Sequence, residues 1–274
     1  MFNWGYKVRN KSRLCNIRVI VSKDRLEIYK YSNYSFKKGE KNNTNGRKGN
    51  GDLSQEQKKE NTKHNRKATL TEARNDIIRL IKCNDDMRTF ITLTYAVDRE
   101  YQESKKDLRK FFRKLNDKYK GLKYLWVLEL TKRNRVHYHI LCNIDFGITH
   151  FEGKRKSKKH KKIERDIAAE YWKNGFIDIR SLGAEGNTNI ALYVSAYLVK
   201  DLLDKEDLKG QRVYGYSYRT MNKPIEYCYW TNMELEEFIK GICEDYQLIF
   251  TNSYDIGIEG KVNYFDLKEK QSGN

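Results

Sequence analysis

Two runs rich in apolar, β-branched and aromatic residues, 123–131 and 136–143, lie on either side of the short polar segment Lys132–Arg135. Such runs are typical of β-strands, and a connection this short joins antiparallel neighbours. Successive side chains of a strand point to opposite faces, so His137 and His139 share one face. The sequence therefore predicts a sheet that presents two imidazoles side by side.

Glu129 is the one carboxylate in the first of these runs, and a carboxylate among apolar neighbours is costly unless it has a cationic partner. An odd-length turn, Lys132 to Asn134, pairs Glu129 with His137, whereas an even-length turn pairs it with Tyr138. The sequence leaves both registers open. The two histidines are either ligands of one divalent cation or simply polar residues on a strand face.

The chain is strongly basic, with 55 Lys and Arg against 37 Asp and Glu and a formal net charge of +18. Such a charge predicts a polyanionic partner, most commonly nucleic acid, and a solvated basic surface is the alternative. The densest basic run is interpreted as a loop that contacts the DNA backbone. It comprises Lys154, Arg155, Lys156, Lys158, Lys159, Lys161 and Lys162. His160 is assigned to this run and not to the histidine pair.

Similar patterns locate the other elements. Strands are expected at 17–21, 26–31, 89–95, 176–180 and 225–230. Helices are expected from the capping box Thr69-Leu70-Thr71-Glu72 to 81, from Ser104 to Gly121, over 163–172, from 187 to about 203 and over 232–239. Residues 37–67 are rich in Lys, Asn, Gly, Gln and Glu, so we expect a flexible basic linker there.

Composition also restricts the cellular setting. The five cysteines form no C-x-x-C pair, so we expect reduced thiols instead of a disulfide or zinc framework. No run approaches the roughly 18 apolar residues of a membrane helix, and the N-terminus does not resemble a signal peptide. A cytoplasmic protein without a membrane partner is expected. The chain has no G-x-x-x-x-G-K-[ST] motif, which argues against a fused helicase.

Three segments, in this order, resemble motifs of the HUH endonucleases, specifically the replication initiators of rolling-circle plasmids and single-stranded DNA phages. Phe90–Tyr95 is similar to their first motif. Trp126–Glu129 and His137–His139 are similar to their acidic strand and their histidine–hydrophobe–histidine motif. Tyr193–Lys200 is similar to their tyrosine motif, usually Y-x-x-K-Y-x-x-K. The resemblance covers residues 66–220.

The resemblance implies an α+β fold, the HUH endonuclease fold, with a central five-stranded antiparallel sheet and packed helices, related to the RNA-recognition fold. The strands compatible with that sheet are those at 17–31, 89–95, 123–131, 136–143 and 176–180. The chain then divides into N-terminal strands with the linker (1–65), a nickase core (66–225) and a C-terminal extension (226–274).

The resemblance also implies a divalent metal, Mn²⁺ or Mg²⁺, held by His137, His139 and Glu129. Mixed imidazole and carboxylate ligands suit these ions better than a structural zinc. Such an ion would polarise the scissile phosphate and neutralise the charge that develops on it.

The tyrosine motif implies the nucleophile. Tyr193, Tyr197 and Lys200 fall at i, i+4 and i+7 and share one helix face, a spacing that by itself also fits a plain amphipathic helix. The family usually has lysine before its second tyrosine, and Ala196 stands there in this chain. Lys200 keeps the second Y-x-x-K unit intact, so Tyr197 is the first choice of nucleophile and Tyr193 the second. Attack on phosphorus would leave a 5′-phosphotyrosine and a free 3′-hydroxyl.

We therefore expect a site-specific enzyme that nicks and joins single-stranded DNA to initiate rolling-circle replication in the cytoplasm of a bacterial host. Its partners would be single-stranded DNA, double-stranded origin DNA, and a host helicase and polymerase. A mobilisation relaxase or an HUH transposase is the alternative within the same chemistry. A non-catalytic nucleic-acid-binding module is the alternative of another class, and metal-dependent cleavage would distinguish it.

Overall fold

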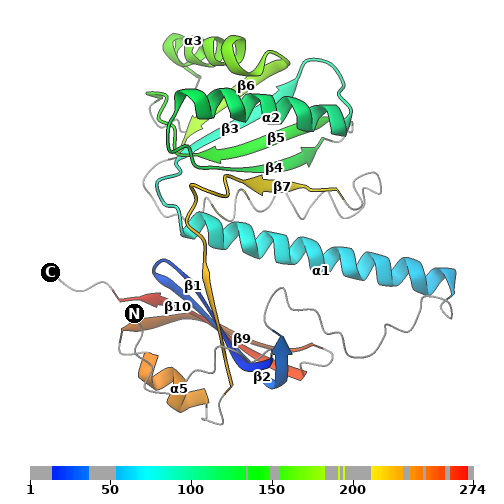
Figure 1. The fold of residues 1–274 in the computed structure, drawn as a ribbon, viewed down its shortest axis with the longest axis vertical. Helices are drawn as coiled ribbons and strands as arrows, with labels where there is room; N and C mark the ends of the chain where they lie inside the picture. The colour runs from blue at the N-terminus through cyan, green and yellow to red at the C-terminus, as the bar shows by residue number, and fades with distance from the viewer. Residues whose placement is uncertain are drawn as a thin grey trace. The chain divides into compact units, whose positions relative to one another are not determined.

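The computed structural model describes residues 14–36, 54–131, 133, 135–148, 155–182, 191, 194, 211–230, 235–242, 245–256 and 260–270. The chain forms two compact units. The central unit comprises residues 54–222, and the terminal unit comprises residues 1–53 together with 223–274 (Figure 1). Each unit contains a five-stranded antiparallel sheet, so the protein is α+β.

The sheet of the central unit has the strand order β6-β3-β5-β4-β7. Its strands are β3 (Thr89–Tyr95), β4 (Tyr124–Leu130), β5 (Val136–Cys142), β6 (Gly175–Ser181) and β7 (Tyr214–Tyr216). The unit also contains the helices α1 (Gln55–Lys82), α2 (Tyr101–Lys118) and α3 (Lys158–Ile167), and α3 continues into the short π-helix η2 (Ala168–Trp172). Four of the expected strands are thus confirmed as members of one sheet.

The two faces of this sheet carry different chemistry. One face, which we call the α2 face, has Tyr138 at its centre, fully buried and with its hydroxyl 2.7 Å from Ser104 Oγ of α2. Phe112 of α2 stacks on Tyr124 of β4 with ring centroids 3.7 Å apart. Figure 1 shows α2 lying across the sheet. The opposite face, which we call the histidine face, carries His137 and His139, because side chains alternate along β5.

The core supports the sheet from both faces. Ile91 and Leu93 on the α2 face are fully buried, and Phe90 on the histidine face is 2% exposed. Ile77 and Ile81 of α1 belong to the same buried cluster. Each side chain of this size contributes about 1.5–3 kcal/mol when buried. The strands that carry the histidines are therefore held on both sides by packing.

The sheet of the terminal unit has the strand order β8-β1-β2-β10-β9. Its strands are β1 (Leu14–Ser22), β2 (Arg25–Phe36), β8 (Ile225–Tyr229), β9 (Tyr246–Ile256) and β10 (Gly260–Glu269), and the helix α5 (Leu235–Ile242) belongs to the same unit. Ile17 and Ile28 pack with Phe238 and Leu267 in a separate core. The expected strand at 225–230 is confirmed as β8.

The expectation that the strands at 17–31 belong to the histidine sheet is wrong. They form β1 and β2, which pair with β8 and β10, and β7 supplies the fifth strand of the histidine sheet. A pattern of period two identifies a strand but does not specify its partner. The division at residues 65 and 225 differs from the compact units for the same reason, because these pairings join the two ends of the chain in one sheet.

Helix α1 begins earlier than the sequence pattern indicated. Ser54 caps it, since the Ser54 side chain accepts a hydrogen bond from the Gln57 N–H while the Gln57 side chain accepts one from the Ser54 N–H at 3.0 Å. The second capping pattern lies inside the helix, where Thr71 Oγ1 donates to the Lys67 carbonyl at 2.9 Å. The expected start at Thr69 is therefore wrong.

Residues 55–67 are helical, which corrects the prediction of a flexible linker for that part of 37–67. Lys, Gln and Glu are good helix formers, and extending a helix costs less than starting one. Residues 37–53 lie outside the described part of the chain. Helix α2 likewise begins at Tyr101 instead of Ser104, whose hydroxyl donates to the Tyr101 carbonyl at 2.7 Å and also contacts Tyr138.

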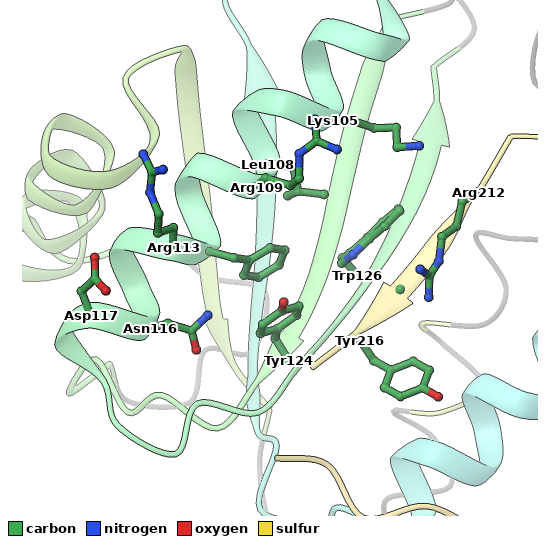
Figure 2. A pocket seen from close by; sticks show the side chains of 12 residues that line it. Lys105, Leu108, Arg109, Arg113, Asn116, Asp117, Tyr124, Trp126, Arg212 and Tyr216 are labelled. Carbon is green, nitrogen blue, oxygen red and sulfur yellow. The ribbon is translucent and has the colours of Figure 1, made fainter. Parts of the chain in front are cut away.

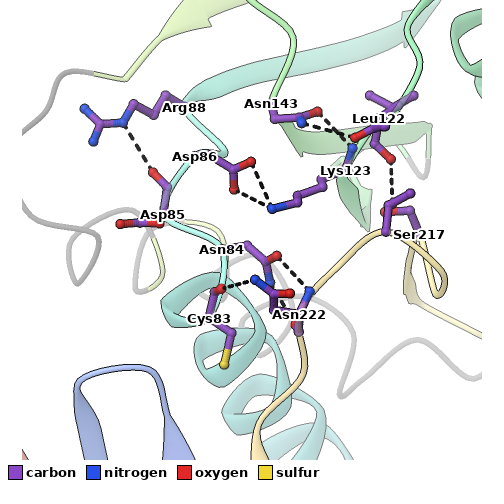
Figure 3. Close-up of polar contacts among 12 residues, drawn as sticks. Cys83, Asn84, Asp85, Asp86, Arg88, Leu122, Lys123, Asn143, Ser217 and Asn222 are labelled. Carbon is purple, nitrogen blue, oxygen red and sulfur yellow. Dashed lines mark hydrogen bonds and ion pairs between the residues drawn. The ribbon is translucent and has the colours of Figure 1, made fainter.

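A buried asparagine ties the end of α1 to the segment that follows β7 (Figure 3). Asn84 is 1% exposed, and its Nδ2 donates to the Asn222 carbonyl at 2.9 Å. The Asn222 N–H donates back to Asn84 Oδ1 at 2.9 Å, and Asn222 Nδ2 donates to the Cys83 carbonyl at 3.3 Å. These contacts anchor the segment that carries β7 along the sheet edge.

No helix among the described residues is long and apolar enough to cross a membrane. Cys15, Cys83, Cys142 and Cys228 are free thiols, as expected, and Cys243 lies outside the described residues.

Candidate functional site

The hairpin β4–β5 has the register that an odd-length turn predicts. Leu130 pairs with Val136 and Glu129 pairs with His137. The Thr131 N–H donates to the Arg135 carbonyl at 3.0 Å and closes the turn. Glu129 therefore lies on the histidine face, and the register that would have paired it with Tyr138 is ruled out.

The Glu129 carboxylate contacts the more distant of the two histidines. Its Oε2 lies 2.6 Å from His139 Nε2, across a diagonal of the strand pair. The other ring nitrogen, His139 Nδ1, lies 3.2 Å from Thr92 Oγ1 of β3. Phe90 stacks on the imidazole with ring centroids 5.5 Å apart. Both nitrogens and one ring face of His139 are therefore engaged, which fixes the orientation of the ring.

The electrostatics of the site favour an ionised carboxylate and a neutral His137. The hydrogen bond from His139 lowers the pKa of Glu129 below its usual value, against the opposing effect of burial. Partial burial lowers the pKa of His137, which outweighs the attraction of Glu129. At neutral pH the site thus offers a carboxylate and an imidazole lone pair, the protonation states that a metal ligand requires.

The residues fit a divalent ion in their chemistry. Among the described residues, no group of three or more His, Cys, Asp or Glu side chains is arranged around one point that could hold a metal ion. The donor types do match, because imidazole and carboxylate ligands suit Mn²⁺ or Mg²⁺. Thr92 Oγ1 also occupies the position of the group that commonly orients a metal-bound histidine through its second ring nitrogen.

Pairing across the sheet reveals an aromatic side chain beside the histidines that the sequence interpretation did not select. Thr94 of β3 pairs with His137 on one side and with Phe176 of β6 on the other, so all three side chains lie on the histidine face. Phe176 is 70% exposed. An exposed aromatic ring in the same row as Glu129 and His137 provides a flat apolar surface next to the acidic and imidazole groups.

The basic run is helical over most of its length, which corrects the prediction of a loop. Helix α3 starts at Lys158, with the Ser157 side chain accepting a hydrogen bond from the His160 N–H. Lys154 lies outside the described residues. The side chains that extend into solvent are those of Arg155, Lys158, Lys159, Lys161 and Lys162. His160 is buried, with Nε2 2.8 Å from the Ile179 carbonyl, so it is structural, as expected.

Lys156 differs from the rest of the run because it takes part in an internal ion-pair network. Its ammonium donates to Glu164 of α3 and to Asp178 of β6, the latter at 2.8 Å. Burial acts to lower the pKa of Lys156, and the two hydrogen bonds outweigh it and raise the pKa overall. Asp178 pairs with Thr92, so the network anchors the basic run beside the histidine face.

The tyrosine motif lies almost entirely outside the described residues. Tyr193, Tyr197 and Lys200 are among those not described. Ala191 and Val194, from the same stretch, are helical and fully buried. The roles of the two tyrosines and of Lys200 stay predictions.

Comparison with known proteins supports the interpretation of the sequence motifs. No curated protein and no solved structure matches the chain. The model of a family described as replication-associated protein ORF2 matches residues 88–202. This range contains β3, β4, β5 and β6, together with Glu129, His137 and His139. The resemblance to replication initiators is thereby confirmed, and residues 88–202 belong to the replication-associated protein ORF2 family.

Proposed function

We propose that the protein nicks and joins single-stranded DNA at a specific site and thereby initiates rolling-circle replication. The observation that carries this proposal is the Glu129–His139 contact beside His137, on one sheet face within the segment related to replication-associated proteins. Host helicase and polymerase activities would then separate and copy the strands.

His137, His139 and Glu129 are the residues that would hold a Mn²⁺ or Mg²⁺ ion. Such an ion would polarise the scissile phosphate and neutralise the negative charge that develops during attack. Thr92 and Phe90 hold the His139 ring in place, so the ligand orientation is set before DNA binds. The low pKa of Glu129 keeps its carboxylate ionised, and the low pKa of His137 keeps its imidazole neutral at neutral pH.

The surroundings of the site suit a DNA strand. The exposed Phe176 ring offers a stacking surface for a base in the row of His137. The first turn of α3 contains no acidic residue, and Lys158 and Lys159 in it are exposed. Cations at a helix N-terminus are unfavourable by about 0.3–1 kcal/mol each. A bound phosphate would remove that repulsion, which supports DNA backbone contact by this turn.

The chemical step is an exchange of esters. A tyrosine oxygen, Tyr197 or Tyr193, attacks phosphorus, the bond from phosphorus to the 3′ oxygen breaks, and a 5′-phosphotyrosine forms. The phenolic proton is transferred in net terms to the departing 3′ oxygen, which becomes a hydroxyl, so no further reactant is needed. A free tyrosine has a pKa of about 10, and the Lys200 ammonium would favour its ionised form. The reverse reaction joins the strand again.

The test is to incubate the full chain with Mn²⁺ and single-stranded DNA from its own replicon, and then to separate the products under denaturing conditions. We expect a covalent adduct that is lost with EDTA and in the double variant Tyr193→Phe/Tyr197→Phe. Tyr119→Phe is the matched control, because Tyr119 is partly exposed and lies outside the motif. The two single variants identify the tyrosine that is used.

Two results would contradict the proposal in different ways. An adduct that persists in the double tyrosine variant would show that another residue is the nucleophile. Tight, salt-sensitive binding without cleavage or adduct across Mn²⁺, Mg²⁺ and other divalent ions would identify a non-catalytic nucleic-acid-binding module.

A further inference from the structure

A cavity of about 590 Å³ opens on the α2 face, on the side of the sheet opposite to the histidines (Figure 2). It lies between helix α2 and the strands β4 and β7 at the sheet edge. Its polar lining includes Lys105, Arg109, Arg113 and Arg212, and its aromatic lining includes Trp126 and Tyr216. None of these residues belongs to the site described above.

The aromatic part of the lining is prepared by the backbone. Gly215 of β7 lies directly beneath the indole of Trp126, and a Cβ atom at Gly215 would be only 2.7 Å from Trp126 Nε1. Glycine at this position therefore lets the indole lie against the strand. Tyr216 also lines the cavity and stacks on Tyr218, with ring centroids 6.3 Å apart. Tyr218 is 70% exposed, so the aromatic surface continues from the cavity into solvent.

The charges around the cavity are unbalanced. Four cationic side chains line it, against the single carboxylate of Asp117. Arg109 and Arg113 are exposed on α2, and neither forms an ion pair within the described part of the chain. Elsewhere on the same helix Lys106 is paired with Glu103 at 2.6 Å. The cavity thus combines flat aromatic rings with unpaired guanidinium groups, which bind phosphate well.

We propose that this cavity binds a nucleotide unit of single-stranded DNA. Its base would lie against Trp126 and Tyr216, and its phosphates would contact Arg109 and Arg113. Such a combination of stacking surface and cationic groove holds single strands without reading their sequence. Because the cavity lies on the α2 face, it would retain a part of the strand away from the histidines. The proposal does not depend on the histidine face being catalytic.

The test measures DNA binding by the full chain in EDTA, with fluorescent oligothymidylate and several salt concentrations. In Arg109→Gln/Arg113→Gln we expect the slope of log affinity against log salt to fall by about 1.4, because each phosphate contact on a single strand contributes about 0.7. Lys110→Gln/Lys120→Gln removes the same charge from exposed positions outside the cavity and serves as the control. Equal losses in both double variants would overturn the proposal.

A second comparison tests contact with the base. Wild-type protein should bind oligothymidylate more tightly than an abasic strand of the same length, and Tyr216→Ala should reduce that preference. An abasic strand that binds equally well would show that the cavity recognises phosphate alone, which contradicts the proposal. Thymidine monophosphate distinguishes the two sources of a nucleotide. Weaker binding than the strand supports a strand site, whereas tighter binding indicates a free nucleotide and overturns the strand assignment.

Discussion

Glu129 pairs across the sheet with His137, yet its carboxylate forms its hydrogen bond with His139, at 2.6 Å. An ionised carboxylate only accepts hydrogen bonds, so the proton between the two groups belongs to His139 Nε2. Metal binding by this nitrogen requires loss of that proton. Ion binding and the Glu129–His139 hydrogen bond are therefore mutually exclusive.

Replacement of the carboxylate tests this relationship. Glu129→Gln keeps the shape of the side chain but removes its charge, so we expect Mn²⁺ affinity to fall by at least about tenfold, the lower end of the loss seen for groups that support a metal site. Isothermal titration with Mn²⁺ measures the change. Glu170→Gln removes an exposed carboxylate from η2 and should leave the affinity unchanged. An unaltered affinity in Glu129→Gln would exclude Glu129 as a ligand.

His137 should make stability depend on pH. Its pKa in the folded protein is lowered from 6.5, chiefly by burial, so the unfolded chain binds a proton at a higher pH than the folded chain does. The stabilisation is complete above the unfolded pKa and is lost as pH falls from about 6.5 towards the lower folded pKa. Urea unfolding of wild type and His137→Gln between about pH 7 and pH 5 measures this effect, and the variant should show the shallower loss. Parallel curves would contradict the expected shift.

Local patterns in the sequence predicted the strands of the histidine sheet well. The alternation in 136–143 and the side chain of Glu129 sufficed to expect imidazoles and a carboxylate on one face, because strand geometry fixes that relation locally. The same reasoning misassigned 17–31, since the partner of a strand depends on distant pairings. Phe176 could not be recognised for the same reason, because its place beside His137 requires the pairing of β6 with β3.

Charge patterns were informative only about exposed residues. Lys156 lies within the basic run, but the sequence does not reveal that its ammonium is held by Glu164 and Asp178. The helix over 55–67 was missed because apolar content was used as the criterion for order, whereas Ser54 and helix propensity determine where α1 begins.

The basic run should divide into structural and DNA-binding residues. Lys159→Gln removes an exposed charge, so we expect unchanged stability and a salt slope of DNA binding that is smaller by about 0.7. Lys156→Gln breaks the contacts with Glu164 and Asp178, so it should lower the stability. Thermal unfolding and salt-dependent DNA binding of both variants separate the two roles. A loss of stability in Lys159→Gln, or none in Lys156→Gln, would refute the division.

Asn84 should be important for the stability of the central unit. Asn84→Ala leaves the Asn222 N–H and carbonyl without their buried partner, and an unsatisfied buried group costs about 1–3 kcal/mol. Urea unfolding measures the free energy of unfolding of the variant. Asn116→Ala, at an exposed position on α2, is the control and should change it by less than about 0.5 kcal/mol. A similar effect of both substitutions would show that the contacts with Asn222 contribute little.

Phe176 should bind DNA without contributing much to folding. Its ring is 70% exposed, so Phe176→Ala is expected to change the free energy of unfolding by less than about 0.5 kcal/mol. Stacking of one base on an aromatic ring contributes about 1–3 kcal/mol to single-strand binding, which corresponds to a loss of about 5- to 150-fold in affinity. Val97→Ala is the matched control, because Val97 is 69% exposed and belongs to the same unit. Fluorescence anisotropy with a single-stranded oligonucleotide measures both variants. If Phe176→Ala binds like Val97→Ala, the strand does not contact β6, and its path across the histidine face must lie on the β4 side of His137.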